Sequence, residues 1–192
     1  VQHQHEITFP FKRFQIQPVW RADKPQKGRY REFYQCDADM IGSNSLVNEI
    51  ELVQLMDDVY TELGIPVTIK INNRKILAGI AEIIGAPEQM TYIATTIDKL
   101  DKIGFEQVEE ELLNNGFSRE QIDIMLFKKG NMRFVPTDSP LYQISALREY
   151  ENAIFQEGLN ELETVLGKTN LKGNNTIDLD FSLARGLNYY TG

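Results

Sequence analysis

Two separated stretches of the chain carry side chains that could bind phosphate, an aromatic base and a small polar ligand. The first, from Phe14 to Gly42, alternates polar with apolar residues on both sides of a cationic loop. Its polar positions combine cations, carboxylates, an amide and one aromatic ring, namely Arg21, Arg31, Phe33, Gln35, Asp37 and Asp39. A guanidinium fork matches phosphate oxygens, and an aromatic ring can stack on a base.

This polar face has two interpretations. As a nucleotide site, it would offer Phe33 to a base and Arg21 to phosphate, while Gln35 and Asp39 would hold an ammonium or an imidazole. As an ordinary sheet face, it would only meet water, which is common in antiparallel sheets. The mixture of residue types and the length of the cationic loop favour the nucleotide site.

The second stretch, from Leu183 to Tyr190, places an arginine beside a glycine and ends in two tyrosines. Gly186 permits close backbone approach next to Arg185. On a strand, Tyr189 and Tyr190 point to opposite faces, so one can pack in a core while the other reaches a ligand. A strand-end arginine in a structural ion pair explains the same residues, and structural ion pairs outnumber catalytic arginines.

The charge distribution argues for a compact anionic ligand. The 192 residues carry a net charge of −8, which disfavours nonspecific binding to nucleic acid. Between Lys24 and Arg31 there are four cations and no acid, whereas Arg74 to Lys168 holds ten cations and sixteen acids. A local basic loop in an acidic protein suits a phosphate group better than a long nucleic-acid backbone.

The alternation predicts the elements that position the first stretch. Residues 14–21 and 31–40 read as two antiparallel strands, joined by a loop over 22–30. Their apolar face, which includes the single tryptophan, Trp20, is expected to be the core. A helix is expected over 46–63, with Ser45 as its N-cap and Gly64 as its stop. A strand over 67–71 is expected to return onto the hairpin.

The remainder of the chain is mainly helical. Helical patterns broken by glycines follow Arg74, then a linker over 131–140, one long helix over 141–166, and a strand from Ile177 that runs straight into the Arg185 stretch. We expect an α+β fold with three segments. Residues 1–73 form a sheet-containing part, 74–140 a helical module whose boundary could extend to 170, and 141–192 a return helix and strand.

Composition excludes several classes of protein. No apolar run approaches the roughly 20 residues that span a bilayer, and the N-terminus has no signal-peptide character. The single Cys36 rules out an internal disulfide, and one cysteine with two histidines argues against a structural zinc site. The chain starts without Met and stops abruptly, so we expect a fragment of a longer protein.

Both stretches resemble motifs of one enzyme family. The segment Phe14–Gly42, with the run WRADKPQKGRYREFYQCD, resembles motif 2 of histidyl-tRNA synthetases, and Leu183–Thr191 resembles their second histidine-specific motif. The resemblance covers essentially the whole chain. It implies part of a class II synthetase antiparallel-sheet catalytic domain, comprising residues 1–73 and 141–192, with a helical insertion domain over 74–140.

The resemblance implies roles for four residues in binding ATP. Arg21 matches the arginine that grips the ATP α-phosphate and the substrate carboxylate. Asp23 stands where the family often has Glu, near the adenine end. Arg29 matches a loop arginine toward the outer phosphates, and Phe33 matches the ring that stacks on adenine.

It also implies roles in binding histidine and in catalysis. Gln35 and Asp39 match residues that hold the bound histidine, Asp39 at its α-amino group. Arg185 matches the catalytic arginine, which lies against the α-phosphate where related enzymes place a metal ion. Tyr189 and Tyr190 match the pair that lines the imidazole pocket.

The implied activity is that of a histidine–tRNA ligase in cytoplasmic protein biosynthesis. Histidine is activated by ATP, with Mg²⁺ as its counter-ion and no protein-bound structural metal, and is then transferred to the 3′ end of tRNA(His). The resemblance further implies a homodimer in the intact enzyme and no association with a membrane.

Some features of the family are absent from the sequence. Asn188 replaces the usual Asp, and motif 1, the Thr-x-Glu loop, motif 3 and the anticodon-binding domain are missing, so the chain alone is expected to be inactive. One alternative is a non-catalytic synthetase paralogue, such as a regulatory subunit of ATP phosphoribosyltransferase. Such proteins share the fold but tend to lose the insertion and the ligand residues, both of which this chain keeps. Another is a module that binds the tRNA acceptor stem, for which the acidic balance gives no support.

Overall fold

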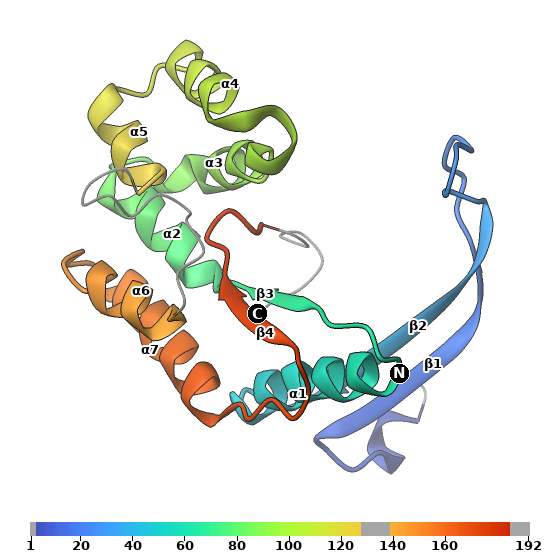
Figure 1. Cartoon of the computed structure of the whole chain (residues 1–192). Helices are drawn as coiled ribbons and strands as arrows, with labels where there is room; N and C mark the ends of the chain where they lie inside the picture. The colour runs from blue at the N-terminus through green and yellow to red at the C-terminus, as the bar shows by residue number, and fades with distance from the viewer. Residues whose placement is uncertain (1–2, 128–138, 185–192) are drawn as a thin grey trace. The chain divides into compact units, whose positions relative to one another are not determined.

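The computed structural model describes residues 3–127 and 139–184, which form the expected α+β fold (Figure 1). They divide into two compact units, Val1–Asn48 and Glu49–Gly192. No helix within the described ranges has the length and apolar character needed to cross a membrane.

The first unit is built on an antiparallel hairpin. After a short 3-10 helix η1 (Gln4–Glu6), strand β1 (Phe11–Trp20) pairs along its whole length with β2 (Glu32–Ile41). At the tip of the connecting loop, Gln26 and Arg29 form a bridge across a turn in which Gly28 has a φ of 77°. The structure thus confirms the two predicted strands and the long loop between them.

The prediction that the apolar face of this hairpin is the core is wrong for the described residues. Its members are among the most exposed large side chains of the chain: Phe14 80%, Ile16 62%, Trp20 69% and Tyr34 75%. The physical reason lies within the unit itself. A two-stranded ribbon is a single layer, and it buries a face only when a second layer covers that face.

A helix and a strand lead into the second unit. Helix α1 (Val47–Glu62) starts after Ser45, whose hydroxyl accepts a hydrogen bond from the backbone N–H of Val47 at 3.4 Å. Gly64 follows its end with a φ of 67°, as predicted for the stop. Strand β3 (Thr68–Ile71) then pairs in parallel with β4 (Thr176–Leu179). The sequence predicted that this strand would return onto the hairpin, but among the described residues its sheet partner is β4.

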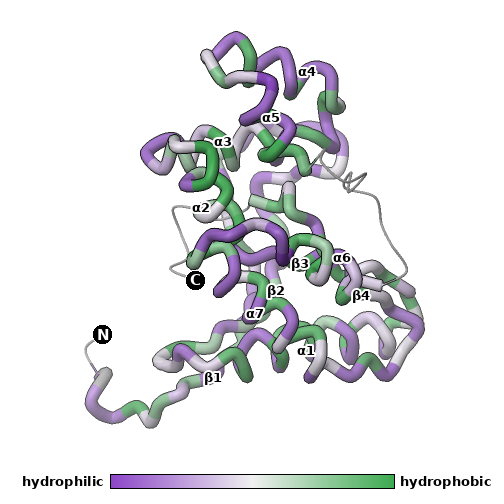
Figure 2. Tube along the Cα trace, turned by 90° about the vertical axis from the view of Figure 1, so that its left-hand side faces the viewer, coloured by the Kyte–Doolittle hydropathy of each residue, from purple (hydrophilic) through white to green (hydrophobic). Residues whose placement is uncertain are grey.

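Seven helical segments occupy the described chain between β3 and β4: α2 (Arg74–Ile83), η2 (Pro87–Gln89), α3 (Met90–Ile97), α4 (Leu100–Asn114), α5 (Arg119–Met125), α6 (Pro140–Leu147) and α7 (Ala153–Lys168). Gly85, Gly104 and Gly116 have positive φ at the predicted breaks. In Figure 2 much of α4 is hydrophilic, whereas α3 contains hydrophobic stretches.

Two boundaries differ from the prediction. The expected single helix over 141–166 is two helices, because Asn152 caps α7 by accepting from the N–H of Phe155 at 2.9 Å. The expected strand into the Arg185 stretch ends at Leu179. There the side chain of Asp180 accepts from the N–H of Ser182 at 3.0 Å, a local turn that competes with strand pairing.

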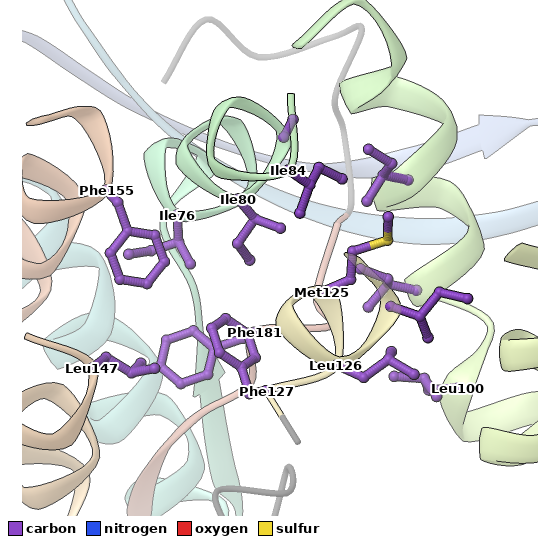
Figure 3. Close-up of a cluster of buried hydrophobic side chains, with 14 of the residues drawn as sticks. Ile76, Ile80, Ile84, Leu100, Met125, Leu126, Phe127, Leu147, Phe155 and Phe181 are labelled. Atoms are coloured by element: carbon purple, nitrogen blue, oxygen red, sulfur yellow. The ribbon is translucent and has the colours of Figure 1, made fainter. Parts of the chain in front are cut away.

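The hydrophobic core lies in the second unit and draws on its helices and on the segment after β4 (Figure 3). At its centre α2 and α7 cross closely, because glycines remove side chains from the contact. A Cβ added to Gly79 would stand 2.6 Å from the Cβ of Phe155, and one added to Gly158 would stand 3.0 Å from the Cβ of Lys75. The core therefore depends on two positions without side chains.

Candidate functional site

The polar face of the hairpin lines up the residues of the first stretch. The register pairs residues of the same parity, placing Arg13 opposite Asp39, Gln15 opposite Asp37, Gln17 opposite Gln35, and Val19 opposite Phe33. Side chains of one parity share a face of a ribbon. Phe33, Gln35 and Asp39, predicted as site residues, therefore stand in one row with Asp37.

Arg21 joins this row from the end of β1. Its backbone N–H donates to the carbonyl of Arg31 at 2.8 Å, which extends the pairing by one step. Its Nη2 donates to Oε1 of Gln35 at 2.9 Å, and its guanidinium carbon lies 5.2 Å from the centre of the Phe33 ring. The guanidinium is thus held by an amide oxygen and an aromatic face while its remaining N–H groups can meet an anion.

Gln35 is held from its other end by a carboxylate. Its Nε2 donates to both oxygens of Asp37, at 2.7 Å and 2.9 Å, and both side chains are partly buried. Hydrogen bonds to an ionised acceptor are stronger than neutral ones. Asp37, Gln35 and Arg21 therefore form a continuous chain of contacts along the polar face.

Asp39 has a different partner at the far end of the row. Nε of Arg13 lies 3.0 Å from Oδ2 of Asp39, and both side chains are about two-fifths exposed, at 40% and 42%. Nη2 of Arg13 also donates to Oε1 of Gln15 at 2.6 Å. The ion pair holds the Asp39 carboxylate on the face where an ammonium group could reach it.

The connecting loop carries the remaining charged positions of the first stretch. Nε of Arg29 lies 3.8 Å from Oδ2 of Asp23, and Nε of Arg31 donates to the backbone carbonyl of Asp23 at 3.4 Å. These side chains are exposed, so the contacts contribute little to stability. They leave the loop cations close to water and accessible to an anionic ligand.

The second unit has a small charged cleft, and part of its lining comes from residues that precede the second stretch in the sequence. Its volume is about 230 Å³, and its lining consists of Lys70, Leu100, Asp101, Phe105, Asp178, Leu179, Asp180 and Ser182. Nζ of Lys70 lies 2.8 Å from Oδ2 of Asp180 and 3.4 Å from Oδ2 of Asp101. The cleft thus contains a lysine that is already neutralised by carboxylates.

Electrostatics in this cleft follow from the shared lysine. The hydrogen bond to Asp180 raises the pKa of Lys70. Burial acts to raise the pKa of Asp180, but hydrogen bonds from Lys70 and Ser182 together hold it below its ordinary value. Burial, and then the negative charge of Asp180, raises the pKa of Asp178.

Asn72 fixes the chain at the edge of the second stretch. Its Nδ2 donates to the carbonyl of Leu183 at 3.0 Å and to that of Phe181 at 3.4 Å. The backbone is therefore anchored two residues before Arg185, although the second stretch itself lies outside the described residues.

The comparisons with known proteins agree with these motifs. A family model described as Histidyl-tRNA synthetase matches residues 2–192. The chain belongs to the histidyl-tRNA synthetase family. The match covers both motif stretches and the helices between them.

Relatives within the histidyl-tRNA synthetase family are similar over the whole chain. Histidine–tRNA ligases of Azobacteroides pseudotrichonymphae and Bacteroides fragilis strain YCH46 are each 54% identical over 197 residues, covering 100% of this chain and 42% of the relative. The crystal structure of histidyl-tRNA synthetase from Nostoc sp. PCC 7120 matches with a TM-score of 0.80 and 32% identity, covering 100% of this chain and 44% of that one. The chain spans about two-fifths of the length of the curated relatives it matches.

The residues predicted from the histidyl-tRNA synthetase motifs are brought together only in part. Arg21 contacts both Phe33 and Gln35, and Asp23 and Arg29 are paired in the loop. Asp39 lies on the same face as Gln35, four residues further along β2. The other three predicted residues, Arg185, Tyr189 and Tyr190, lie outside the described residues.

The resemblance to the histidyl-tRNA synthetase motifs assigned no role to Asp37 or Arg13, two residues that orient other side chains on the polar face of the hairpin. Asp37 holds the amide of Gln35, and Arg13 holds the carboxylate of Asp39. Alternation put Asp37 on the polar face of its strand, whereas Arg13 lies one residue before the strand predicted over 14–21. The strand register, which pairs Arg13 with Asp39, is the signal that would have assigned the second contact.

Proposed function

We propose that this chain is the central part of a histidine–tRNA ligase and carries part of the site where histidine is activated by ATP. The proposal depends on the position of Arg21. In this chain, which belongs to the family, Arg21 contacts Phe33 and Gln35 on one face of the hairpin. This arrangement brings together a guanidinium that can bind phosphate, an aromatic ring that can stack on a base, and a polar amide.

In this proposal the hairpin binds ATP through its arginines and its aromatic ring. Adenine stacks on Phe33, near Asp23, and Arg29 meets the outer phosphates. Arg21 exchanges its contacts with the ring and the amide for the α-phosphate and the histidine carboxylate. Support comes from its position, since its guanidinium carbon lies 5.2 Å from the centre of the ring on which adenine would stack, and a guanidinium fork matches phosphate oxygens.

Histidine binds at the other side of the same face. Gln35 and Asp39 hold its polar groups, with Asp39 at the α-ammonium, and Tyr189 and Tyr190 line the imidazole pocket. The ion pair between Asp39 and Arg13 supports this role, because it keeps a carboxylate oriented on the polar face.

The proposed reaction has two steps. An oxygen of the histidine carboxylate attacks the α-phosphorus of ATP, forming histidyl-adenylate and releasing pyrophosphate. A ribose hydroxyl at the tRNA 3′ end then attacks the carbonyl carbon of the adenylate, forming the ester and releasing AMP. Negative charge grows at the α-phosphate in the first step, so the fixed cations Arg21 and Arg185 stabilise that transition state.

The proposal extends to the domains and partners of the whole protein. Residues 1–73 and 141–192 belong to the class II catalytic domain, and residues 74–140 form the helical insertion domain. The partners are histidine, ATP accompanied by Mg²⁺ as its counter-ion, and tRNA(His). The intact enzyme acts as a homodimer in the cytoplasm.

The test is histidine-dependent exchange of pyrophosphate into ATP, measured with the whole protein that carries this sequence. We expect exchange with histidine and none with other amino acids. Arg21→Ala should lower the exchange rate by about 10²- to 10³-fold, as expected for losing one group that stabilises the transition-state charge. Arg119→Ala, which removes an exposed arginine paired with Glu109 in the helical part, is the matched control and should leave exchange unchanged.

Two results would reject the proposal. Binding of histidine without any exchange would favour the regulatory subunit of ATP phosphoribosyltransferase instead. Full exchange in Arg21→Ala would remove Arg21 from the activation step.

A further inference from the structure

The side-chain amide of Gln35 has a fixed orientation in the structure. A glutamine amide presents an acceptor oxygen at one end and a donor nitrogen at the other, and rotation by half a turn exchanges them. Here Nε2 donates to both oxygens of Asp37, at 2.7 Å and 2.9 Å. The nitrogen is therefore directed along β2 toward Asp37, and Oε1 is left facing Arg21.

Two groups hold this orientation, and they differ in whether they can remain in place when substrates bind. Arg21 donates to Oε1 at 2.9 Å but is exposed, and the proposed function moves it to the α-phosphate and the histidine carboxylate. Asp37 is partly buried in the middle of β2. Once Arg21 engages the substrates, Asp37 is the group in the described structure that still holds the amide nitrogen.

We propose that Asp37 is a positioning residue, which fixes the amide of Gln35 so that only its oxygen is offered to the amino-acid substrate. This inference rests on the proposed function. An amide locked in this way accepts hydrogen bonds and cannot donate them to the ligand. It therefore selects a ligand that brings an N–H group, such as the α-ammonium or an imidazole N–H, and disfavours one that presents only a lone pair.

The first variant is Asp37→Asn, which keeps the size of the side chain but replaces one acceptor oxygen with a donor nitrogen. One of the two hydrogen bonds from Gln35 is lost, the other becomes neutral, and the amide is free to turn. We expect the KM for histidine in pyrophosphate exchange to rise by about tenfold, in line with the loss of a hydrogen bond to a charged group. The KM for ATP and kcat should change by less than about threefold.

The second variant reverses the polarity of the contact. In Gln35→Glu with Asp37→Asn, the residue at position 35 is an acceptor whichever way it turns, and Asn at position 37 donates to it. We expect this double variant to recover most of the lost histidine affinity. Gln35→Glu alone should be worse than Asp37→Asn, because two carboxylates then face each other across a contact that measures 2.7 Å in the structure.

Glu32→Gln is the matched control for charge. It removes one negative charge from the same strand, but Glu32 pairs with Trp20 and has the opposite parity to Asp37. It should leave the KM for histidine unchanged. A rise equal to that in Asp37→Asn would show a general charge effect and overturn the inference.

A readout without activity separates this inference from the proposed function. In the ¹⁵N-labelled chain, the side-chain amide signal of Gln35 should shift in Asp37→Asn and not in Glu32→Gln. If the unaltered protein shows no histidine-dependent exchange, the proposed function fails, and with it the substrate role assigned here. If exchange is present but the KM for histidine is unchanged in Asp37→Asn, or the double variant is no better than the single one, this inference alone is overturned.

Discussion

The crossing of α2 and α7 makes the sharpest prediction about stability. In Gly79→Ala, the new Cβ would stand 2.6 Å from the Cβ of Phe155 and 2.8 Å from its Cα and its backbone N. These atoms cannot be moved by a change of rotamer. Since carbon atoms pack best at about 3.5–4.0 Å, the two helices must separate by about 1 Å.

The magnitude follows from two opposing effects. Overpacking in a well-packed core typically costs about 1–3 kcal/mol, and a clash with backbone atoms belongs at the upper end of that range. Alanine is favoured over glycine within a helix by about 1 kcal/mol. The free energy of unfolding should therefore fall by about 2 kcal/mol, which for a chain of this size lowers Tm by about 4–8 °C.

Thermal unfolding of the 192-residue chain, followed by far-ultraviolet circular dichroism, measures this change. The matched control is Gly167→Ala near the end of α7, where an added Cβ meets no atom within 4 Å. That substitution should raise Tm, because it adds helix propensity without a clash. An unchanged or raised Tm in Gly79→Ala would show that the helices do not approach as closely as described.

Two further predictions concern acid stability and the exposed hairpin face. Asp57 is 1% exposed, and its pKa is lowered by hydrogen bonds from the backbone of Lys172 and then from the side chain of Asn175. Its contribution to the free energy of unfolding should be complete above about pH 4 and be lost as pH falls through the lowered pKa of the folded state. In Asp57→Asn, the free energy of unfolding from urea titrations at a series of pH values should therefore fall less steeply in acid. Trp20 is 69% exposed, so its fluorescence should be readily quenched by acrylamide; a protected, blue-shifted emission would contradict the exposed face.

The elements that the sequence predicted well are those set by local patterns. Alternation over 14–21 and 31–40 identified both strands of the hairpin, because a period of two is a property of each strand alone. Ser45 and Gly64 marked the ends of α1 through capping and a positive φ, which are also local. The resemblance to motif 2 then gave roles to residues on a face that alternation had already defined.

The predictions that were wrong concern the burial of the hairpin face, which depends on a second layer, and the helix over 141–166, which an N-cap residue divides. Whether Phe14 and Trp20 are buried depends on a second layer, which the strand itself does not encode. The division of the helix over 141–166 did have a local signal, the N-cap residue Asn152, but the apolar spacing continued across it. The contacts of Gln35 with Asp37 and Arg21 required side-chain orientations that the alternation pattern does not specify.

The pairing of β3 with β4 also constrains how the second unit is made during translation. Thr68 in β3 pairs with Thr176 in β4. During translation, β3 therefore leaves the ribosome 108 residues before its partner strand does. At about 5–20 residues per second, that interval is on the order of 5–20 s. Helices α2 to α5 are complete within it and can associate locally, whereas the parallel pair closes a long loop and must form late. In a nascent chain halted before β4, β3 lacks the strand with which it pairs in the described structure, and a chaperone that binds strand edges would find its target there.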